Sequence, residues 1–402
     1  MKPHLASHPQ RPTPGPRACL ALASLTLSAG AWANPADNWQ VGAVLDVAQT
    51  SRSLALGQRE QGLQLGHSDV SLGGPVGQAL QARLSVAAHS HDGKLATEVE
   101  EAYLQTRSLP AGLQLRAGRF ASQIGYLNEQ HPHADDFAER PLLYRAFLGG
   151  HWFDDGLRLN WTAPTPFYLR TGLEVFSGRQ LMPEATGARR PGAVALSARL
   201  GHDWSASGSW QLGAAWLLNR RTAHMLGDEA SEHHDHDHEH DDDHGETHAE
   251  DHGHDHAHGA VFNGRHTTLL DATWKWSPGG NNREQQLKLV GEWAQVRGLN
   301  AHAQRSDRHI ARSLMAVWRW SAAWESGIRF DALRARSPHE DHFHSVRLRE
   351  RSLMLAYKPT HAQTVRLQWS QQRGAQGIDG AASRSLQLQH VLSFGAHGAH
   401  SF

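Results

Sequence analysis

Residues 314–332 read LMAVWRWSAAWESGIRFDA, and this stretch decides the fold. Apolar side chains recur at every second position from Leu314 onward and again from Ile328 onward, on either side of a short break. Because successive side chains of a strand point to opposite faces, the pattern indicates two β-strands joined by a tight turn. Arg329 and Asp331 fill the alternate positions, so the second strand has one apolar and one charged face.

The same alternation recurs from residue 39 to the end of the chain, in segments of about ten residues. It is typical of a transmembrane antiparallel β-barrel, which has an apolar face toward lipid and a polar face toward the lumen. A soluble β-protein also alternates, but it would bury the apolar face and expose the charged one. The recurring segments are 39–47, 80–86, 157–161, 167–175, 210–218, 270–276, 287–293, 314–320, 324–332, 365–369 and 386–394.

Charged residues at the alternate positions favour a wet lumen. Aromatic residues near the segment ends resemble the girdles of outer-membrane barrels, and the terminal Phe402 resembles a signal read by the barrel assembly machinery. A basic lumen favours anions or anionic metal chelates, unless these arginines pair with carboxylates. The arginines predicted to line the pore are Arg116, Arg158, Arg170, Arg199, Arg329 and Arg366.

The connections predict about sixteen strands, with fourteen or eighteen as alternatives. Short turns rich in Gly and Pro alternate with longer connections, as they do between the periplasmic and outer sides of bacterial barrels. Turns are expected at 73–75 and 109–112, for example, and outer loops at 120–154, 219–264 and 334–345. A barrel of this width has room for an aqueous channel.

Composition excludes several classes of protein. The chain has 402 residues, one cysteine and no run of 18 apolar residues, so a helical membrane protein and a disulfide scaffold are both excluded. A basic start, an apolar run from Ala18 to Ala29 and the small residues of Ala31-Trp32-Ala33 predict a signal peptide over 1–33. Residues 34–402 are then the barrel, exported to the bacterial outer membrane and in contact with its lipid.

A run of histidine and acid occupies residues 232–258, with eleven His, eleven acidic residues and no Lys or Arg. Lacking large aliphatic residues, the region 228–260 is predicted to be a disordered extracellular loop. Imidazole with carboxylate suits Zn²⁺, Ni²⁺ or Cu²⁺, held exchangeably with no tightly bound cofactor, unless the run is only a solvated spacer. Its candidate ligands are His233, His234, His236, His238, His240, His244, His248, His252, His254, His256 and His258.

Two smaller groups lie in other outer loops. One comprises His339, His342 and His344, and the other His131, His133, Asp135 and Asp136. The second group belongs to 120–154, which is too apolar for a free surface loop. In porins a long third loop folds into the barrel, so these four residues are expected to line or approach a constriction, unless the loop only plugs the mouth.

The chain resembles a family of Gram-negative outer-membrane proteins described as zinc-regulated porins or receptors. The resemblance rests on the long His/Asp loop and on four segments: GRFASQIGYLNEQHPHADDF (118–137), RPLLYRAFLGG (140–150), DDGLRLNWTAP (154–164) and GAHGAHSF (395–402). It implies expression under zinc limitation and passage of metal across the outer membrane. Some relatives are described as energised receptors, but a strand at Trp39 leaves no room for an N-terminal plug.

These observations predict a passive outer-membrane channel that gathers divalent metal, zinc first, on its outer loops. The alternatives are a surface metal-binding barrel without an open pore and a receptor that needs a partner for transport. No Gly-x-Ser-x-Gly or His-Glu-x-x-His motif suggests an enzyme. No basic helix suggests nucleic-acid binding. A homotrimer is a further expectation that the sequence leaves open.

Overall fold

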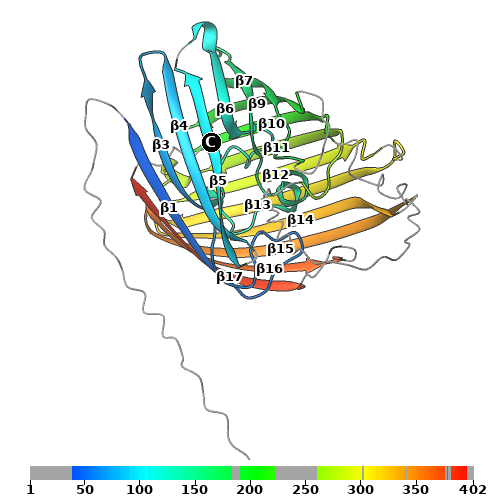
Figure 1. Cartoon of the computed structure of the whole chain (residues 1–402). Helices are drawn as coiled ribbons and strands as arrows, with labels where there is room; N and C mark the ends of the chain where they lie inside the picture. The colour runs from blue at the N-terminus through cyan, green and yellow to red at the C-terminus, as the bar shows by residue number, and fades with distance from the viewer. Residues whose placement is uncertain are drawn as a thin grey trace, which may run out of the picture. The chain divides into compact units, whose positions relative to one another are not determined.

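The chain folds into a closed antiparallel β-barrel of sixteen strands, seen here in a computed structural model (Figure 1). The first strand pairs with the last over Gly42–Thr50 and Gln387–Gly395, which closes the sheet. The fold class predicted from the alternation is therefore confirmed. The structure describes residues 39–91, 93–107, 109–182, 191–221, 260–300, 303–339, 342–375, 378 and 382–395. The predicted signal peptide, the histidine run and Phe402 lie outside these residues.

Seventeen strand segments make up the sixteen passes. β2 and β3 pair with the two ends of β1 on the same side, so they form one strand interrupted at residues 66 and 67. The segments are β1 (Gln40–Thr50), β2 (Gly62–Leu65), β3 (Ser68–Val76), β4 (Leu80–His91), β5 (Lys94–Thr106), β6 (Leu113–Ala121), β7 (Phe153–Thr162), β8 (Tyr168–Phe176), β9 (Ala193–Ser205), β10 (Gly208–Asn219), β11 (His266–Trp276), β12 (Gln286–Arg297), β13 (Arg308–Ser321), β14 (Trp324–His339), β15 (His342–Thr360), β16 (Gln363–Arg373) and β17 (Arg384–Gly395).

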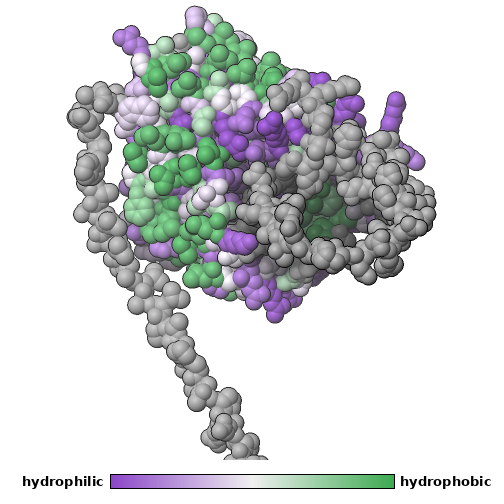
Figure 2. All heavy atoms as spheres, viewed as in Figure 1, coloured by the Kyte–Doolittle hydropathy of each residue, from purple (hydrophilic) through white to green (hydrophobic). Residues whose placement is uncertain are grey.

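Hydrophobic side chains cover the outside of the barrel and polar ones fill the inside. Leu314, for example, is 59% exposed, whereas the preceding residue, Ser313, faces the lumen and is 5% exposed. Figure 2 shows apolar atoms gathered over the outer face of the strands in view. This inversion of a soluble protein matches a barrel that stands in lipid around a wet interior. Among the described residues, no helix is long and apolar enough to span a membrane.

Two predicted connections are corrected. The turn expected at 73–75 is strand, because β3 continues to Val76 and pairs with β4; the chain turns at residues 77–79 instead. The loop expected at 334–345 is mostly a hairpin, in which β14 and β15 pair as far as His339 and His342. In both places alternation continues through residues whose composition suggests a loop.

The third long connection, residues 122–152, folds into the barrel as predicted; we call it L3 (Figure 1). It contains the helix α1 (Leu142–Leu148), which is buried along its whole length and packs against β13 and β14. Gly149 ends this helix in the left-handed conformation, where glycine has no steric penalty. Among the described residues, the chain also forms the short 3₁₀ turns η1 (Pro110–Gly112), η2 (Pro132–Ala134) and η5 (Pro278–Gly280), of which η2 belongs to L3.

Hydrogen bonds tie L3 to the opposite wall of the barrel. The Tyr144 hydroxyl donates to Glu292 Oε1 on β12 at 2.5 Å, and Arg145 Nη2 donates to Glu350 Oε2 on β15 at 2.6 Å. The carbonyl oxygen of Asp135 accepts from Arg366 Nη2 on β16 at 2.6 Å. These contacts hold the loop across the lumen, so its position relative to the wall is fixed at several points.

Candidate metal centre

A break in the regular pleat of β5 places two consecutive carboxylates inside the barrel. Ser85 pairs with Glu101 and Val86 pairs with Val99, so Glu100 is the extra residue of a β-bulge. A bulge shifts the alternation by one residue. As a result Glu100 and Glu101 are both buried in the lumen, at 0% and 7% exposure.

Histidines from L3 and from the break between β2 and β3 surround these carboxylates. His67 Nε2 lies 3.1 Å from Glu100 Oε2, and His131 Nδ1 lies 3.2 Å from the same oxygen. His151 Nε2 lies 3.3 Å from Glu100 Oε1. One carboxylate thus contacts three imidazoles that come from distant parts of the chain.

A fourth histidine extends the group. His133 Nδ1 lies 3.0 Å from Asp69 Oδ2 on β3, and the His133 ring lies 5.6 Å from the His131 ring between centroids. The His67 ring lies 5.4 Å from the His151 ring. We call His67, Asp69, Glu100, His131, His133 and His151 the histidine–carboxylate cluster.

The ligand atoms of the cluster form two overlapping groups, within each of which all atoms lie within 4.8 Å of one another. The first is His67, Asp69, His131 and His133, and the second is His67, Glu100 and His151. Three or four ligands with this mixture of imidazole and carboxylate suit Zn²⁺ and related transition metals, not Ca²⁺ or Mg²⁺. His67 belongs to both groups.

The cluster contains buried polar atoms with poorly aligned partners. The Nδ1 atoms of His131, His133 and His151 are buried, and within the described residues none makes a hydrogen bond of good geometry. Buried polar atoms are normally satisfied, so such a concentration needs a physical cause. A metal ion that accepts these lone pairs supplies one, and the donor set therefore fits a transition metal.

Opposing electrostatic effects act on the loop histidines. Burial alone would lower the pKa of His131, but Glu100 and Glu101 outweigh it and raise the pKa to about 10. His151 behaves alike: burial is outweighed by Glu100 and Glu98, and its pKa rises to about 9. For His133 burial prevails over Asp69 and the pKa is lowered. Protons therefore occupy part of the cluster near neutral pH, and a metal ion must displace them.

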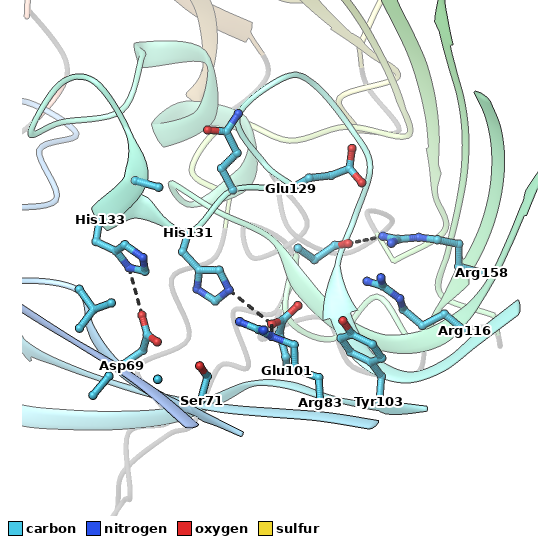
Figure 3. A pocket seen from close by; sticks show the side chains of 16 residues that line it. Asp69, Ser71, Arg83, Glu101, Tyr103, Arg116, Glu129, His131, His133 and Arg158 are labelled. Atoms are coloured by element: carbon cyan, nitrogen blue, oxygen red, sulfur yellow. Dashed lines mark hydrogen bonds and ion pairs between the residues drawn. The ribbon is translucent and has the colours of Figure 1, made fainter. Parts of the chain in front are cut away.

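A cavity of about 250 Å³ adjoins the cluster. Figure 3 shows His131 and His133 reaching from L3 toward Glu101 and Asp69 on the barrel wall. Arg116 and Arg158 lie at the other side of the same cavity. A second cavity, of about 560 Å³, shares Glu129 with the first and extends to His202 and Asp203 near the end of β9. The cluster thus has open space beside it.

The predicted ligands of L3 separate in the structure. His131 and His133 enter the cluster, whereas Asp135 pairs with Arg140 at 2.7 Å and Asp136 with Lys288 Nζ at 2.6 Å. His339 and His342 form the last pair of the β14–β15 hairpin, and His344 follows on β15 with an exposed side chain. The side chains of His339 and His342 and all eleven histidines of the 232–258 run lie outside the described residues.

Sequence reasoning missed His67, Asp69, Glu100 and His151. A signal was present for the first two, because His67 and Asp69 are two residues apart and would share a face if they lay on one strand. The run Glu98–Glu101 is also visible. The bulge that turns Glu100 and Glu101 to the same side leaves no mark in a period-two pattern.

The six predicted pore-lining arginines all point inward, and most have carboxylate partners. Arg158 pairs with Glu174 at 2.6 Å and Arg170 with Glu129 at 2.5 Å. Arg199 lies 3.5 Å from Glu129 as well. The remaining three are Arg116, which donates to Gln105; Arg329, which pairs with Asp331 and Glu350; and Arg366, which donates to Gln389 and Asp135. Pairing within the lumen, the alternative to a freely basic pore, therefore describes much of this set.

Comparison with solved structures places the fold among outer-membrane porins. The chain resembles OprB of Pseudomonas putida at high pH, with a TM-score of 0.54, 12% identity, and coverage of 89% of this chain and 94% of that one. It resembles the anion-selective porin of Comamonas acidovorans with a TM-score of 0.51, 10% identity, and coverage of 89% and 100%. It also resembles the outer-membrane channel DcaP of Acinetobacter baumannii, with a TM-score of 0.51, 10% identity, and coverage of 89% of this chain and 97% of that one. At these identities the likeness shows the fold alone, a porin-like β-barrel.

Sequence comparisons add little. No family model matches the chain. Over 127 residues it is 41% identical to an uncharacterised protein of Aquifex aeolicus, and the match covers 32% of this chain. The matched part spans about a quarter of that relative, 26% of its length.

Proposed function

We propose that this protein is an outer-membrane channel that gathers divalent transition metal, zinc first, on its histidine-rich outer loops and lets it pass to the periplasm. One observation carries the proposal: the histidine–carboxylate cluster lies inside the barrel, where L3 crosses the lumen. Four imidazoles and two carboxylates that converge in a channel form a binding point on a transport path. The resemblance to zinc-regulated outer-membrane proteins supports the choice of metal.

In this proposal the chain's own residues work in sequence. The outer histidines raise the local concentration of metal, because neutral imidazoles coordinate at neutral pH. The cluster then binds an ion with ligands from both L3 and the wall. Its two overlapping ligand groups share His67, so an ion can exchange one group for the other without losing every ligand. Such partial binding suits conduction, which requires that a site be left as readily as it is entered.

A second function is favoured by the anchoring of L3. The contacts of Tyr144, Arg145 and Asp135 with the far wall close part of the lumen. A barrel closed in this way would bind metal at the surface without conducting, or would need a partner to open it.

OmpT of Vibrio cholerae, a similar barrel, has been solved in a trimer form, and we propose a homotrimer here too.

Flux of ⁶⁵Zn²⁺ into proteoliposomes, together with single-channel current, tests the proposal. The channel should carry zinc, and His67→Ala should reduce saturable flux and zinc-dependent block of the current. His361→Ala, at an exposed turn between β15 and β16, is the matched control and should behave as the wild type. Zinc binding with neither flux nor current would favour the non-conducting barrel instead.

A further inference from the structure

A dense group of arginines lies on the outside of the barrel, at the end that carries the long connections. Seven of the exposed arginines on β13 to β17 point outward in one group. Figure 1 shows these five strands side by side. The direction follows from the alternation, since their neighbours Ser313 and Glu350 are buried in the lumen. We call this set the arginine belt: Arg312, Arg334, Arg347, Arg349, Arg351, Arg373 and Arg384.

Among the residues that the structure describes, the charge of the belt has no acidic partner. Arg334 pairs directly with Arg347 across β14 and β15, and Arg349 with Arg373 across β15 and β16. Like charges directly opposite on neighbouring strands are destabilising. No carboxylate of the described residues lies within 4.0 Å of any belt arginine, so the sheet itself does not offset the repulsion.

The belt is confined to one part of the barrel wall. Near the same end, the outward positions of several other strands hold neutral residues such as Gln49 on β1, Thr97 on β5, Val194 on β9 and Thr268 on β11, whereas β6 and β12 each carry one outward arginine, Arg119 and Arg297. The concentration on β13–β17 is therefore local, and a general preference for basic rims does not account for it.

The belt also has a defined depth relative to the membrane. Exposed apolar residues begin at the edge of the belt farthest from the loops. Phe330, level with Arg351 on the neighbouring strand, is 45% exposed, and Leu353, two residues beyond Arg351, is 49% exposed. These side chains need lipid tails as surroundings. The arginines two residues nearer the loops therefore lie at the level of the head groups of the outer leaflet.

We propose that the arginine belt binds the phosphate groups of the phosphorylated glycolipid, lipopolysaccharide, that forms the outer leaflet. Guanidinium groups bind phosphate bidentately and stack closely without losing charge. Neighbouring arginines on adjacent strands lie about 5 Å apart, so one phosphate can bridge two of them. The acyl chains of the same lipid would cover the apolar band below, which a free phosphate ion cannot do.

The test is a titration of the full-length folded protein in non-ionic detergent with purified lipopolysaccharide. Each basic residue near an anionic lipid surface adds to the free energy of binding. Replacing three of them should therefore weaken lipid binding by about a hundredfold. The variant is Arg334→Gln, Arg347→Gln and Arg349→Gln together. The control is Arg52→Gln, Arg265→Gln and Arg283→Gln, which removes the same charge from exposed positions outside the belt and should bind as the wild type.

Two further arms separate the sources of phosphate. Enzymatically dephosphorylated lipopolysaccharide should bind the wild type as weakly as intact lipid binds the triple variant. Inorganic phosphate alone should compete poorly, and competition at equal concentration would overturn the assignment to a lipid. Equal binding of wild type and triple variant would also overturn it. So would a triple variant that binds lipid normally but changes from oligomer to monomer in light scattering, because the belt would then join copies of the chain.

Discussion

Glu100 and Glu101 are neighbours in the chain, yet both side chains point into the lumen. The β-bulge opposite Ser85 and Val86 produces this arrangement. Their partners differ, because Glu100 contacts three imidazoles whereas Glu101 contacts His131 and pairs with Arg83 at 2.5 Å. The bulge therefore supplies one carboxylate to a candidate ligand group and a second that orients His131.

Glu100→Gln should weaken zinc binding more than Glu101→Gln. Glu100 belongs to a ligand group, while Glu101 acts through His131, and loss of such an outer partner costs roughly 10–100-fold in metal affinity. Competition with a chromophoric zinc chelator measures both. Glu284→Gln, on an exposed turn, is the control. Equal affinities for the two variants would contradict the assignment of roles.

His67→Ala should weaken zinc binding in both ligand groups, whereas His151→Ala and Asp69→Asn should each weaken it in one group. The reason is that His67 is common to both ligand groups and the other two residues each belong to one. Anomalous diffraction at the zinc edge, on crystals of the full chain, locates the ions apart from any held by the outer loops. An unchanged zinc peak in His67→Ala would exclude this arrangement.

Much of the barrel follows from the sequence because lipid and lumen act on every strand. Each residue that faces lipid must be apolar, so the period of two persists over the whole sheet, as in 314–332. Strand boundaries are harder to predict where the composition suggests a turn but the residues pair within a strand. Gly73, Gly74 and Pro75 resemble a turn, yet all three pair with β4 as part of a strand.

Only part of the candidate metal centre could be predicted from the sequence, because its ligands come together through tertiary structure. The HPH motif of L3 predicted His131 and His133, and the apolar character of the loop predicted that it enters the lumen. Nothing in local spacing says which wall the loop approaches. His67 and Glu100 join the cluster because β3 and β5 form that wall, and Asp135 turns away because Arg140 and Arg366 bind it.

Tyr144→Phe should loosen L3. The hydroxyl donates to Glu292 and accepts from the Leu127 amide at 2.9 Å, so its removal leaves buried polar groups unsatisfied. The expected loss is about 1–3 kcal/mol of stability. Heat-dependent unfolding in detergent should shift downward, and single-channel conductance should become larger or noisier. Tyr357→Phe, on the outer face, should change neither.

Glu129→Gln should make the channel more selective for anions. Glu129 offsets the charges of Arg170 and Arg199 at the edge of the larger cavity, at 2.5 and 3.5 Å. With an amide in its place, both guanidiniums attract anions and repel cations. Reversal potentials in a salt gradient measure the change, and Glu284→Gln is again the control. An unshifted reversal potential would place Glu129 away from the conducting path.

The ion selectivity of the wild type should change with pH only when the Glu129 carboxyl group is protonated. Burial alone would raise the pKa of Glu129, but Arg170, Arg199 and Arg158 outweigh it and lower the pKa to about 2. A depressed folded pKa means that the charge, and the pairing it supports, persists below the pH at which an ordinary glutamate is protonated and is lost only as pH falls toward 2. The wild type should therefore keep its selectivity at pH 4, where an exposed glutamate is already half protonated, while Glu129→Gln shows the altered value at every pH. A change in wild-type selectivity centred near pH 4.5 would mean that, in the membrane, the arginines do not keep this carboxylate ionised.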